Sequence, residues 1–291
     1  MQEAGSTTMS SVSASSPSTS QKHGRVPVFP PFETVLTELL DGDVMLVTLN
    51  RPEVGNARNT QMARELLQIW TTLADAPGEV ACVVLTGAGE RIFCAGGDLK
   101  QRDGMTDEDW RAQHVIFEHG RDKLLACPMP VIAAVNGHAY GGGCETALAC
   151  DFIYAVRGSR FALPEVSRGI LPGSGGTQFL ARAVGERRAK EIIMGGQPFT
   201  AEQGYEWGLV NQLCERGSLL ADVLKGAAAI TTNAPLAVRE AKRSIHDGLQ
   251  LPLRAGLDQE VEAYNRLVVT EDRREGVRAF NEKRRPKWAW R

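Results

Sequence analysis

The sequence predicts an α/β fold, and three observations support that class. Apolar runs typical of buried strands alternate with segments whose apolar residues recur at a helical period. The runs at 81–87 and 131–135 are continuously apolar, as in strands that are covered on both faces. Glycine-rich segments follow both runs, and α/β proteins carry their functional groups where strands end.

The composition is that of an ordinary globular protein. The chain has 291 residues, 43% hydrophobic and 23% charged, which is long enough to bury a sizeable core. Its formal net charge of -2 gives no general attraction to nucleic acid or to an anionic membrane. No apolar run of about 18 residues occurs, so we expect no transmembrane helix.

The cysteine and histidine patterns argue against a metal site. The six cysteines lack CxxC pairs and sit mostly in apolar runs, as buried thiols do in a reducing compartment, and we expect a cytoplasmic protein. His114 and His119 would lie on different sides of a helix, and no HExxH motif occurs. We therefore expect no bound metal.

Three regions follow from composition and periodicity. Residues 1–30 are rich in Ser, Thr, Gln and Pro, and we expect a disordered tail without a signal or transit peptide. Residues 31–215 carry the strands and the glycine-rich loops. Residues 216–291 show only helical patterns and no catalytic-looking loop, so their expected role is packing or assembly.

The elements of the central region are predicted from local signals. A hairpin over residues 34–40 and 43–50 turns at Asp41-Gly42. Asn59 caps a helix that Pro77-Gly78 ends. A second helix is expected over residues 107–125 with Asp107 as its cap.

Further along, residues 131–135 form the next strand. Strands at 152–156 and 160–163 are expected to pair across a tight turn, which brings the end of the second strand back beside the start of the first. Residues 200–203, Thr-Ala-Glu-Gln, form a capping box that opens another helix.

The most informative stretch is residues 134–145, Ala-Val-Asn-Gly-His-Ala-Tyr-Gly-Gly-Gly-Cys-Glu. Three consecutive glycines lose much conformational entropy on folding, so a close approach of a ligand to bare N–H groups is the expected reason for them. A short helix begins there with Glu145 in its first turn, and helix starts favour anions. The stretch predicts an anion-stabilising turn beside an acid/base residue.

A second carboxylate, Glu165, follows the predicted strand pair and is expected to face the same pocket as Glu145. The glycine-rich residues 169–178 come next. They lack the GK[ST] ending of a P-loop, and no GxGxxG opens a helix, so neither nucleotide hydrolysis nor NAD binding is favoured.

Together these motifs resemble the enoyl-CoA hydratase/isomerase (crotonase) family. The resemblance rests on residues 94–100 (CAGGDLK), 136–145 (NGHAYGGGCE), 164–165 (PE) and 171–178 (LPGSGGTQ), in the family's order and spacing. It implies a crotonase-like spiral of ββα turns and a C-terminal helical region that drives trimerisation, usually into a homohexamer of two homotrimers. It also implies an acyl-CoA thioester substrate, with no cofactor apart from the coenzyme A that the substrate carries, and a place in fatty acid metabolism such as beta-oxidation.

The resemblance assigns roles to individual positions. Gly97 and Gly142 supply the two backbone N–H groups of an oxyanion hole, which stabilises charge on the thioester oxygen. Glu145 and Glu165 hold one water between them, one carboxylate activating it for addition to Cβ and the other moving a proton, and such a pair is expected to titrate as a coupled unit. Gly173 helps to position that water. Members with both glutamates are similar to hydratases, so we expect hydration of a trans-2-enoyl-CoA or the reverse dehydration.

Other positions are implied in binding the substrate or its CoA. They are Ala57, Ala95, Asp98, Leu99 and Lys100 near the site, and Phe280 and Lys283, which would reach CoA bound to a neighbouring subunit. Gly55 stands where many members carry a basic residue near the CoA phosphates, and Arg58 and Lys100 are the candidates to replace that charge. A solvated basic helix end is an equally favoured interpretation of Lys283, Arg284, Arg285 and Lys287.

Four alternatives remain. On the same scaffold the chain could be a carnitinyl-CoA-type dehydratase or an enoyl-CoA isomerase. From another class, it could be an inactive acyl-CoA-binding or RNA-binding relative, although both glutamates argue against the first and the near-neutral charge against the second. Residues 101–120 would shape the acyl pocket, yet we expect Trp110, Val115 and Phe117 to pack in the core.

Overall fold

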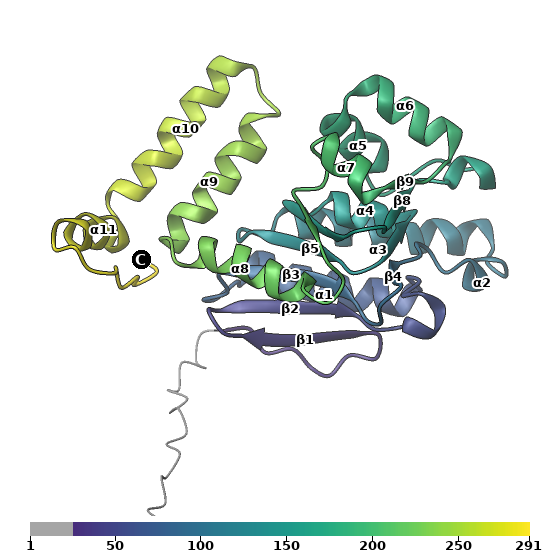
Figure 1. Cartoon of the computed structure of the whole chain (residues 1–291), viewed down its shortest axis with the longest axis horizontal. Coiled ribbons are helices and arrows are strands. Elements are labelled where there is room, and N and C mark those ends of the chain that lie inside the picture. The colour runs from purple at the N-terminus through teal and green to yellow at the C-terminus, as the bar shows by residue number, and fades with distance from the viewer. Residues whose placement is uncertain (1–25) are drawn as a thin grey trace, which may run out of the picture.

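Two sheets organise the molecule, and the computed structural model describes them within residues 26–291 (Figure 1). The six-stranded sheet has the order β1-β2-β3-β5-β7-β10, with β1 antiparallel to β2 and the other neighbours parallel. The four-stranded sheet has the order β4-β6-β8-β9, with its first three strands parallel. The strands are β1 (Val35–Leu40), β2 (Val44–Leu49), β3 (Cys82–Gly87), β4 (Ile92–Cys94), β5 (Val131–Val135), β6 (His138–Tyr140), β7 (Phe152–Val156), β8 (Arg160–Ala162), β9 (Phe199–Thr200) and β10 (Gln212–Cys214).

Successive turns of the chain place one strand in each sheet. β3 is followed by β4, β5 by β6 and β7 by β8, with the first of each pair in the large sheet and the second in the small sheet. The helices are α1 (Thr60–Asp75), α2 (Leu99–Arg102), α3 (Asp107–Leu125), α4 (Gly142–Leu148), α5 (Gly176–Val184), α6 (Glu186–Gly195), α7 (Ala201–Glu206), α8 (Leu219–Thr231), α9 (Pro235–Gly248), α10 (Leu253–Val268) and α11 (Glu271–Asn281), with 3-10 turns η1 (Pro52–Val54) and η2 (Glu165–Arg168). The expected α/β class and ββα spiral are confirmed.

The large sheet has a core on each face. Because neighbouring side chains of a strand point to opposite faces, β3 sends Val83 and Leu85 into one cluster and Cys82 and Val84 into the other. The first cluster includes the buried side of α1, and the second includes the buried residues of α8. This burial on both faces explains why the strand reads as a continuous apolar run. All six cysteines are free thiols, and five of them are buried.

Most local signals are confirmed. Asn59 caps α1 by accepting a hydrogen bond from the Met62 N–H at 2.9 Å, and Thr200 and Gln203 form the capping box of α7. The expected cap at Asp107 is wrong, because extended Thr106 occupies the cap and accepts from the Asp109 N–H. Asp107 instead lies in the first helical turn, where its negative charge interacts favourably with the helix dipole.

The expected pairing of residues 152–156 with 160–163 is also wrong. β7 pairs with β5 and β10 in the large sheet, whereas β8 pairs with β6 and β9 in the small one. Gly158 at φ +74 lets the chain turn from one sheet to the other. The end of β8 is therefore brought next to the end of β6 by parallel pairing and not by a hairpin.

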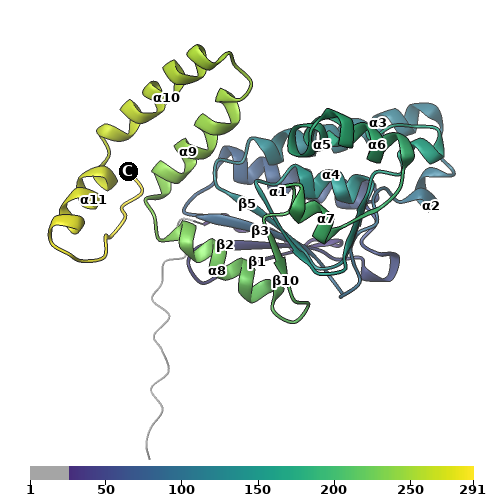
Figure 2. The same cartoon turned by 45° about the horizontal axis from the view of Figure 1, so that its top comes forward.

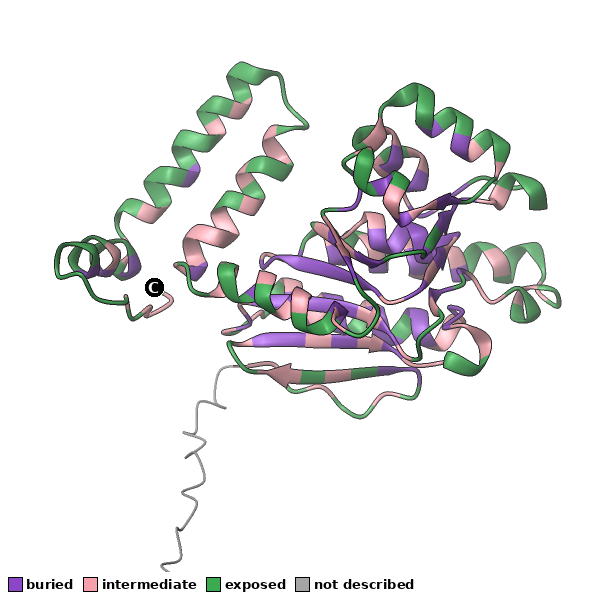
Figure 3. Cartoon of the chain, in the orientation of Figure 1, coloured by how far each residue is buried: buried purple, intermediate pink, exposed green. Residues whose placement is uncertain are grey.

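The C-terminal helices α9, α10 and α11 stand apart from the sheets (Figures 1 and 2). Much of their surface is exposed (Figure 3), and it includes large apolar side chains: Ile245, Leu249, Leu253, Leu257, Val261, Tyr264, Val269, Val277 and Phe280. An exposed apolar surface of this extent marks an interaction face.

At the other end of the chain, Val26 and Phe29 pack against the main core. Of the tail that was expected over residues 1–30, residues 1–25 lie outside the described part of the chain. Among residues 26–291, no helix combines the length and the apolar character that crossing a membrane requires.

Candidate active site

The small sheet places the candidate residues. Its strands β4, β6 and β8 are parallel neighbours, so their carboxyl ends meet at one edge. β4 leads into Gly96 and Gly97, β6 into Gly142 and Glu145 of α4, and β8 into Glu165 of η2. Three segments that are distant in sequence thus deliver the two glycines and the two glutamates to one place.

The Gly97 and Gly142 N–H groups are both available as donors. Gly142 is the first residue of α4, where an N–H has no intrahelical acceptor. Around Gly97, the Arg58 N–H donates to the Gly96 carbonyl at 2.7 Å and the Asp98 N–H donates to the Arg58 carbonyl at 3.0 Å. No hydrogen bond within residues 26–291 uses the N–H of Gly97 or of Gly142.

Gly141 is the residue that lets β6 turn directly into α4. Its φ of +52 with ψ of -126 is a backbone conformation that side chains disfavour. A Cβ at this position would also lie 3.0 Å from Glu165 Oε1. The glycine therefore admits both the turn and the second glutamate.

Glu145 is buried, with 4% of its surface exposed. Its Oε1 accepts hydrogen bonds from the Ser174 N–H at 2.6 Å and from the Gly176 N–H at 2.9 Å. These two donors fix the carboxylate toward the pocket, which Gly173 also lines. The sequence reasoning missed Ser174 and Gly176, and the signal that could have found them is the glycine-rich loop in which they lie.

Glu165 lines the same pocket as Glu145. Burial raises the pKa of its carboxyl from 4.5 to about 6, and the Glu145 charge acts in the same sense, against a backbone hydrogen bond and the charges of Arg168 and Arg58. Its buried Oε2 has no hydrogen-bond partner among the described residues. The Glu165 carboxyl thus has a pKa close to neutral pH, and its Oε2 is available to bind a reacting group.

The raised pKa of Glu165 predicts a stability gain for Glu165→Gln. A carboxyl that binds its proton more tightly when folded contributes stability below pH 4.5 that is lost as pH rises through 6. We therefore expect Glu165→Gln to be more stable than the wild type at pH 8 by roughly 1 to 2 kcal/mol. The advantage should vanish at pH 4, and urea unfolding at both pH values measures it.

The control for this experiment is Glu202→Gln. Burial opposes ionisation of Glu202, but the Gly158 N–H donates to its carboxylate at 2.9 Å and helps to hold its pKa below the usual value. This control should be less stable than the wild type at pH 8, with a difference that shrinks toward pH 4. If Glu165→Gln were equally or less stable than the wild type at pH 8, burial of the ionised Glu165 carboxylate would not destabilise the protein, contrary to this prediction.

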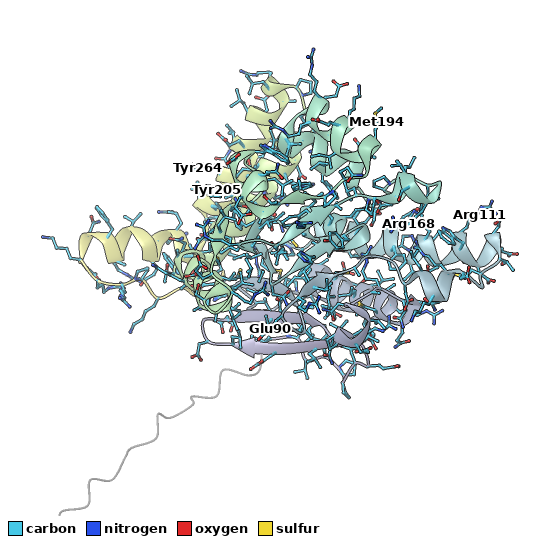
Figure 4. All side chains as sticks on the ribbon, turned by 45° about the vertical axis from the view of Figure 1, so that its right-hand side comes forward. Glu90, Arg111, Arg168, Met194, Tyr205 and Tyr264 are labelled. Carbon is cyan, nitrogen blue, oxygen red and sulfur yellow. The ribbon has the colours of Figure 1, made fainter. Side chains whose placement is uncertain are left out.

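The pocket around the glutamates has a volume of about 840 Å³. Trp110, Val115 and Phe117 of α3 line it, so their expected confinement to the core is wrong, although Phe117 is also buried. Because α3 packs against α1 beside the pocket, its inner face is at once core and pocket wall. Arg111 and Arg168 also line the pocket and lie on the same side of the molecule (Figure 4).

The predicted CoA-binding positions divide into three groups. Ala95 and Leu99 line the pocket. The Ala57 carbonyl and Asp98 both accept from Arg51 Nη1, and Asp98 also caps α2, while Lys100 is exposed beside them. Phe280, 83% exposed on α11, and Lys283 are not among the residues that line this pocket.

The local structure accounts for the glycine at position 55, where the family resemblance implies a basic residue. Gly55 has φ +64 and ends η1, where its N–H donates to the Pro52 carbonyl. Arg58, one candidate to replace the missing charge, is only 8% exposed and donates to Thr146 Oγ1 at 2.8 Å. Its side chain is therefore turned inward, and exposed Lys100 remains as the candidate.

The fold and this site define an α/β enzyme in which two carboxylates and two available backbone N–H groups share one pocket, and its similarity to known proteins gives the family. The enoyl-CoA hydratase/isomerase family model matches residues 40–291. The chain therefore belongs to the enoyl-CoA hydratase/isomerase family, as its motifs indicated.

Individual relatives are similar over nearly the whole chain. A short-chain-enoyl-CoA hydratase from Clostridium acetobutylicum is 39% identical, covering 84% of this chain and 94% of its own. A 2,3-dehydroadipyl-CoA hydratase from Escherichia coli is 38% identical with the same coverage. The crystal structure of an enoyl-CoA hydratase from Bacillus anthracis superposes with a TM-score of 0.87 at 39% identity, covering 89% of this chain and 100% of that one.

Proposed function

We propose that the protein hydrates trans-2-enoyl-CoA thioesters to 3-hydroxyacyl-CoA, or catalyses the reverse dehydration. The observation that carries the proposal is that Glu145 and Glu165 line one pocket beside the Gly97 and Gly142 N–H groups, which have no acceptor within residues 26–291. The relatives named as enoyl-CoA hydratases support it. The acyl-CoA is the substrate, and the reaction needs no cofactor beyond the CoA that the substrate carries.

In this mechanism the thioester oxygen accepts from the N–H groups of Gly97 and Gly142. Addition of water at Cβ pushes electron density toward that oxygen, and fixed donors stabilise the enolate without reorganising. Removing one such donor typically costs about 3 to 4 kcal/mol of transition-state stabilisation.

The glutamates handle the water and its protons. Glu145, held by Ser174 and Gly176, takes a proton from the water as its oxygen bonds to Cβ. Glu165, whose pKa is raised to about 6, supplies a proton to Cα. Gly173 lies beside Glu145 at the pocket wall and is the candidate to help position the water.

The test is an assay with crotonyl-CoA that follows loss of the ultraviolet absorbance of the conjugated thioester. Hydration to 3-hydroxybutyryl-CoA, identified by mass spectrometry, is the expected result. Migration of the double bond without uptake of water would favour the isomerase alternative. Binding of CoA thioesters without turnover of any chain length would overturn the proposal and favour an inactive relative.

We also propose that the protein assembles as a homotrimer or homohexamer through its C-terminal helices. The exposed apolar side chains of α9, α10 and α11 support this assignment because water contact with such a surface is unfavourable. In an assembly, Phe280 and Lys283 of one subunit would approach CoA in another. Cytoplasmic location suits the free thiols.

The assembly proposal predicts the effect of charge on α10. Leu257 and Val261 are exposed and lie on one face, one helical turn apart. Leu257→Glu combined with Val261→Glu should shift the protein to a monomer in sedimentation velocity, because burying both charges in an interface is costly. Exposed Glu260→Gln on the same helix is the control and should keep the wild-type mass. An unchanged mass of the double variant would exclude this helix face from the interface.

A further inference from the structure

Two arginine side chains form the side of the pocket behind the oxyanion glycines. Arg58 follows η1 and Arg102 ends α2, and both line the pocket. Their guanidinium groups lie near one aromatic ring, with the Arg58 Cζ 4.8 Å and the Arg102 Cζ 5.6 Å from the centroid of Phe117. The proposed hydration mechanism uses neither of them.

Each guanidinium lies against one of the oxyanion glycines. A Cβ built on Gly97 would come within 3.0 Å of the Arg102 Cζ. A Cβ built on Gly142 would collide with the Arg58 Nη2. The positive charges thus lie next to the position that the thioester carbonyl takes, at the start of the acyl chain.

Both arginines are bonded to neutral groups. Arg58 Nη1 donates to Thr146 Oγ1 at 2.8 Å, and Arg102 Nε donates to Gln113 Oε1 at 2.9 Å. Neither forms an ion pair with a carboxylate within residues 26–291, and the buried Arg58 Nε has no hydrogen-bond partner there. Burial lowers the pKa of the Arg102 guanidinium, and repulsion by the Arg58 charge lowers it further. The negative charges of Glu145 and Glu165 act in the opposite sense but do not cancel this lowering.

Packing alone is a poor explanation for this pair. The stacking of Arg102 on Trp110, with 4.5 Å from Cζ to the ring centroid, stabilises it in part. An aliphatic side chain would fill the same volume without the desolvation cost of a buried charge that forms no direct ion pair among residues 26–291. Two adjacent guanidinium groups with free donor capacity are instead the usual means of binding a carboxylate.

We propose that Arg58 and Arg102 bind a carboxylate on the acyl chain, so that the substrate class is short 2-enoyl-CoA thioesters that carry a second acid group. This assignment rests on the proposed hydratase function and narrows it. A carboxylate near Glu145 and Glu165 would otherwise be repelled, and the two guanidinium groups offset that repulsion. Their closeness to Gly97 and Gly142 favours a carboxylate only a few carbons from the thioester.

The first test compares matched substrates on the wild-type enzyme. Glutaconyl-CoA and trans-2-pentenoyl-CoA share a five-carbon chain and differ in a terminal carboxylate, and 2,3-dehydroadipyl-CoA and trans-2-hexenoyl-CoA form the equivalent six-carbon pair. We expect kcat/KM to favour the acid by at least about tenfold in at least one pair. The unreactive analogues glutaryl-CoA and pentanoyl-CoA should show the same order of affinity in calorimetry.

The second test removes the charge of Arg102. In Arg102→Gln the ratio of kcat/KM between acid and neutral substrate should fall at least about tenfold, whereas Arg102→Lys should retain part of it because one cation remains. Arg182→Gln is the matched control, because Arg182 is an exposed arginine of α5 that donates to Gln178 Oε1 at 3.1 Å and does not line the pocket, and its ratio should stay at the wild-type value.

The outcomes separate this inference from the hydratase proposal. Equal kcat/KM within both pairs and equal affinity of the analogues would overturn the carboxylate site while leaving hydration intact. A fall of the same factor for acid and neutral substrates in Arg102→Gln would also overturn it, because the arginine would then serve the common thioester. Failure of every enoyl-CoA to take up water, with analogues still bound, would instead reject the hydratase function. The analogue measurement on the wild type stands even if a variant fails to fold.

Discussion

Glu145→Gln and Glu165→Gln should each lower the turnover of crotonyl-CoA by at least about 10²-fold. Glutamine has nearly the shape of glutamate but cannot take up or release the proton that hydration requires. In Glu145→Gln the amide oxygen can still accept from the Ser174 and Gly176 N–H groups, so the local structure should be retained. Initial rates at saturating substrate measure the effect.

Glu186→Gln is the control for this pair. Glu186 is exposed and pairs with Lys190 on α6, away from the pocket, and its loss should leave turnover unchanged. Near-wild-type turnover of Glu165→Gln would reject hydration by two carboxylates and direct attention to the isomerase alternative. Because Glu165→Gln should also be more stable at pH 8, low activity in that variant cannot be ascribed to unfolding.

Gly143→Ala should damage both stability and turnover. A Cβ on Gly143 would collide with the carbonyl oxygen of Cys94 and would lie 2.6 Å from the Cys94 Cβ. Cys94 ends β4 just before Gly97, so the collision would push α4 away from the loop that carries Gly97, the other proposed oxyanion donor. We expect a loss of about 1 to 3 kcal/mol from overpacking and roughly 10²-fold in kcat from the misplaced donors.

Gly195→Ala provides the comparison for that substitution. Gly195 ends α6, and a Cβ built there meets nothing within 4 Å. Its free energy of unfolding should match or exceed that of the wild type, because alanine favours the helical conformation. Wild-type kcat and melting temperature in Gly143→Ala would show that α4 and the Gly97 loop adjust independently, contrary to the close packing of the two glycine turns.

The elements that the sequence predicted well are those with local causes. The Asn59 cap and the Thr200 capping box depend on side chains within three residues of the N–H groups that they bind. The hairpin of β1 and β2 turns at Gly42, which has φ +77. The buried strand β3 was visible because its residues face two cores, one on each side of the sheet.

The elements that were missed or misassigned depend on distant partners. β4, β6 and β8 have three residues each, too short for a periodic signal, and β8 was wrongly paired with β7. Their pairing partners lie far away along the chain, and parallel pairing leaves no turn signal between them. Trp110 was assigned to the core because helical periodicity cannot distinguish a core contact from a pocket wall.

The sequence by itself determined which functional groups the protein carries. They are two glycine-rich turns and two glutamates, within the motifs of the enoyl-CoA hydratase/isomerase family. Residue types and short spacings carry that information because a bare N–H or a carboxylate acts through its own atoms. Only the tertiary structure decided which of these groups meet. Three parallel strands bring Gly97, Gly142 and the glutamates to one edge, and the packing of α2 and α3 brings Arg102 and Arg58 together at Phe117. These meetings depend on long-range pairing and side-chain packing, which no local pattern encodes.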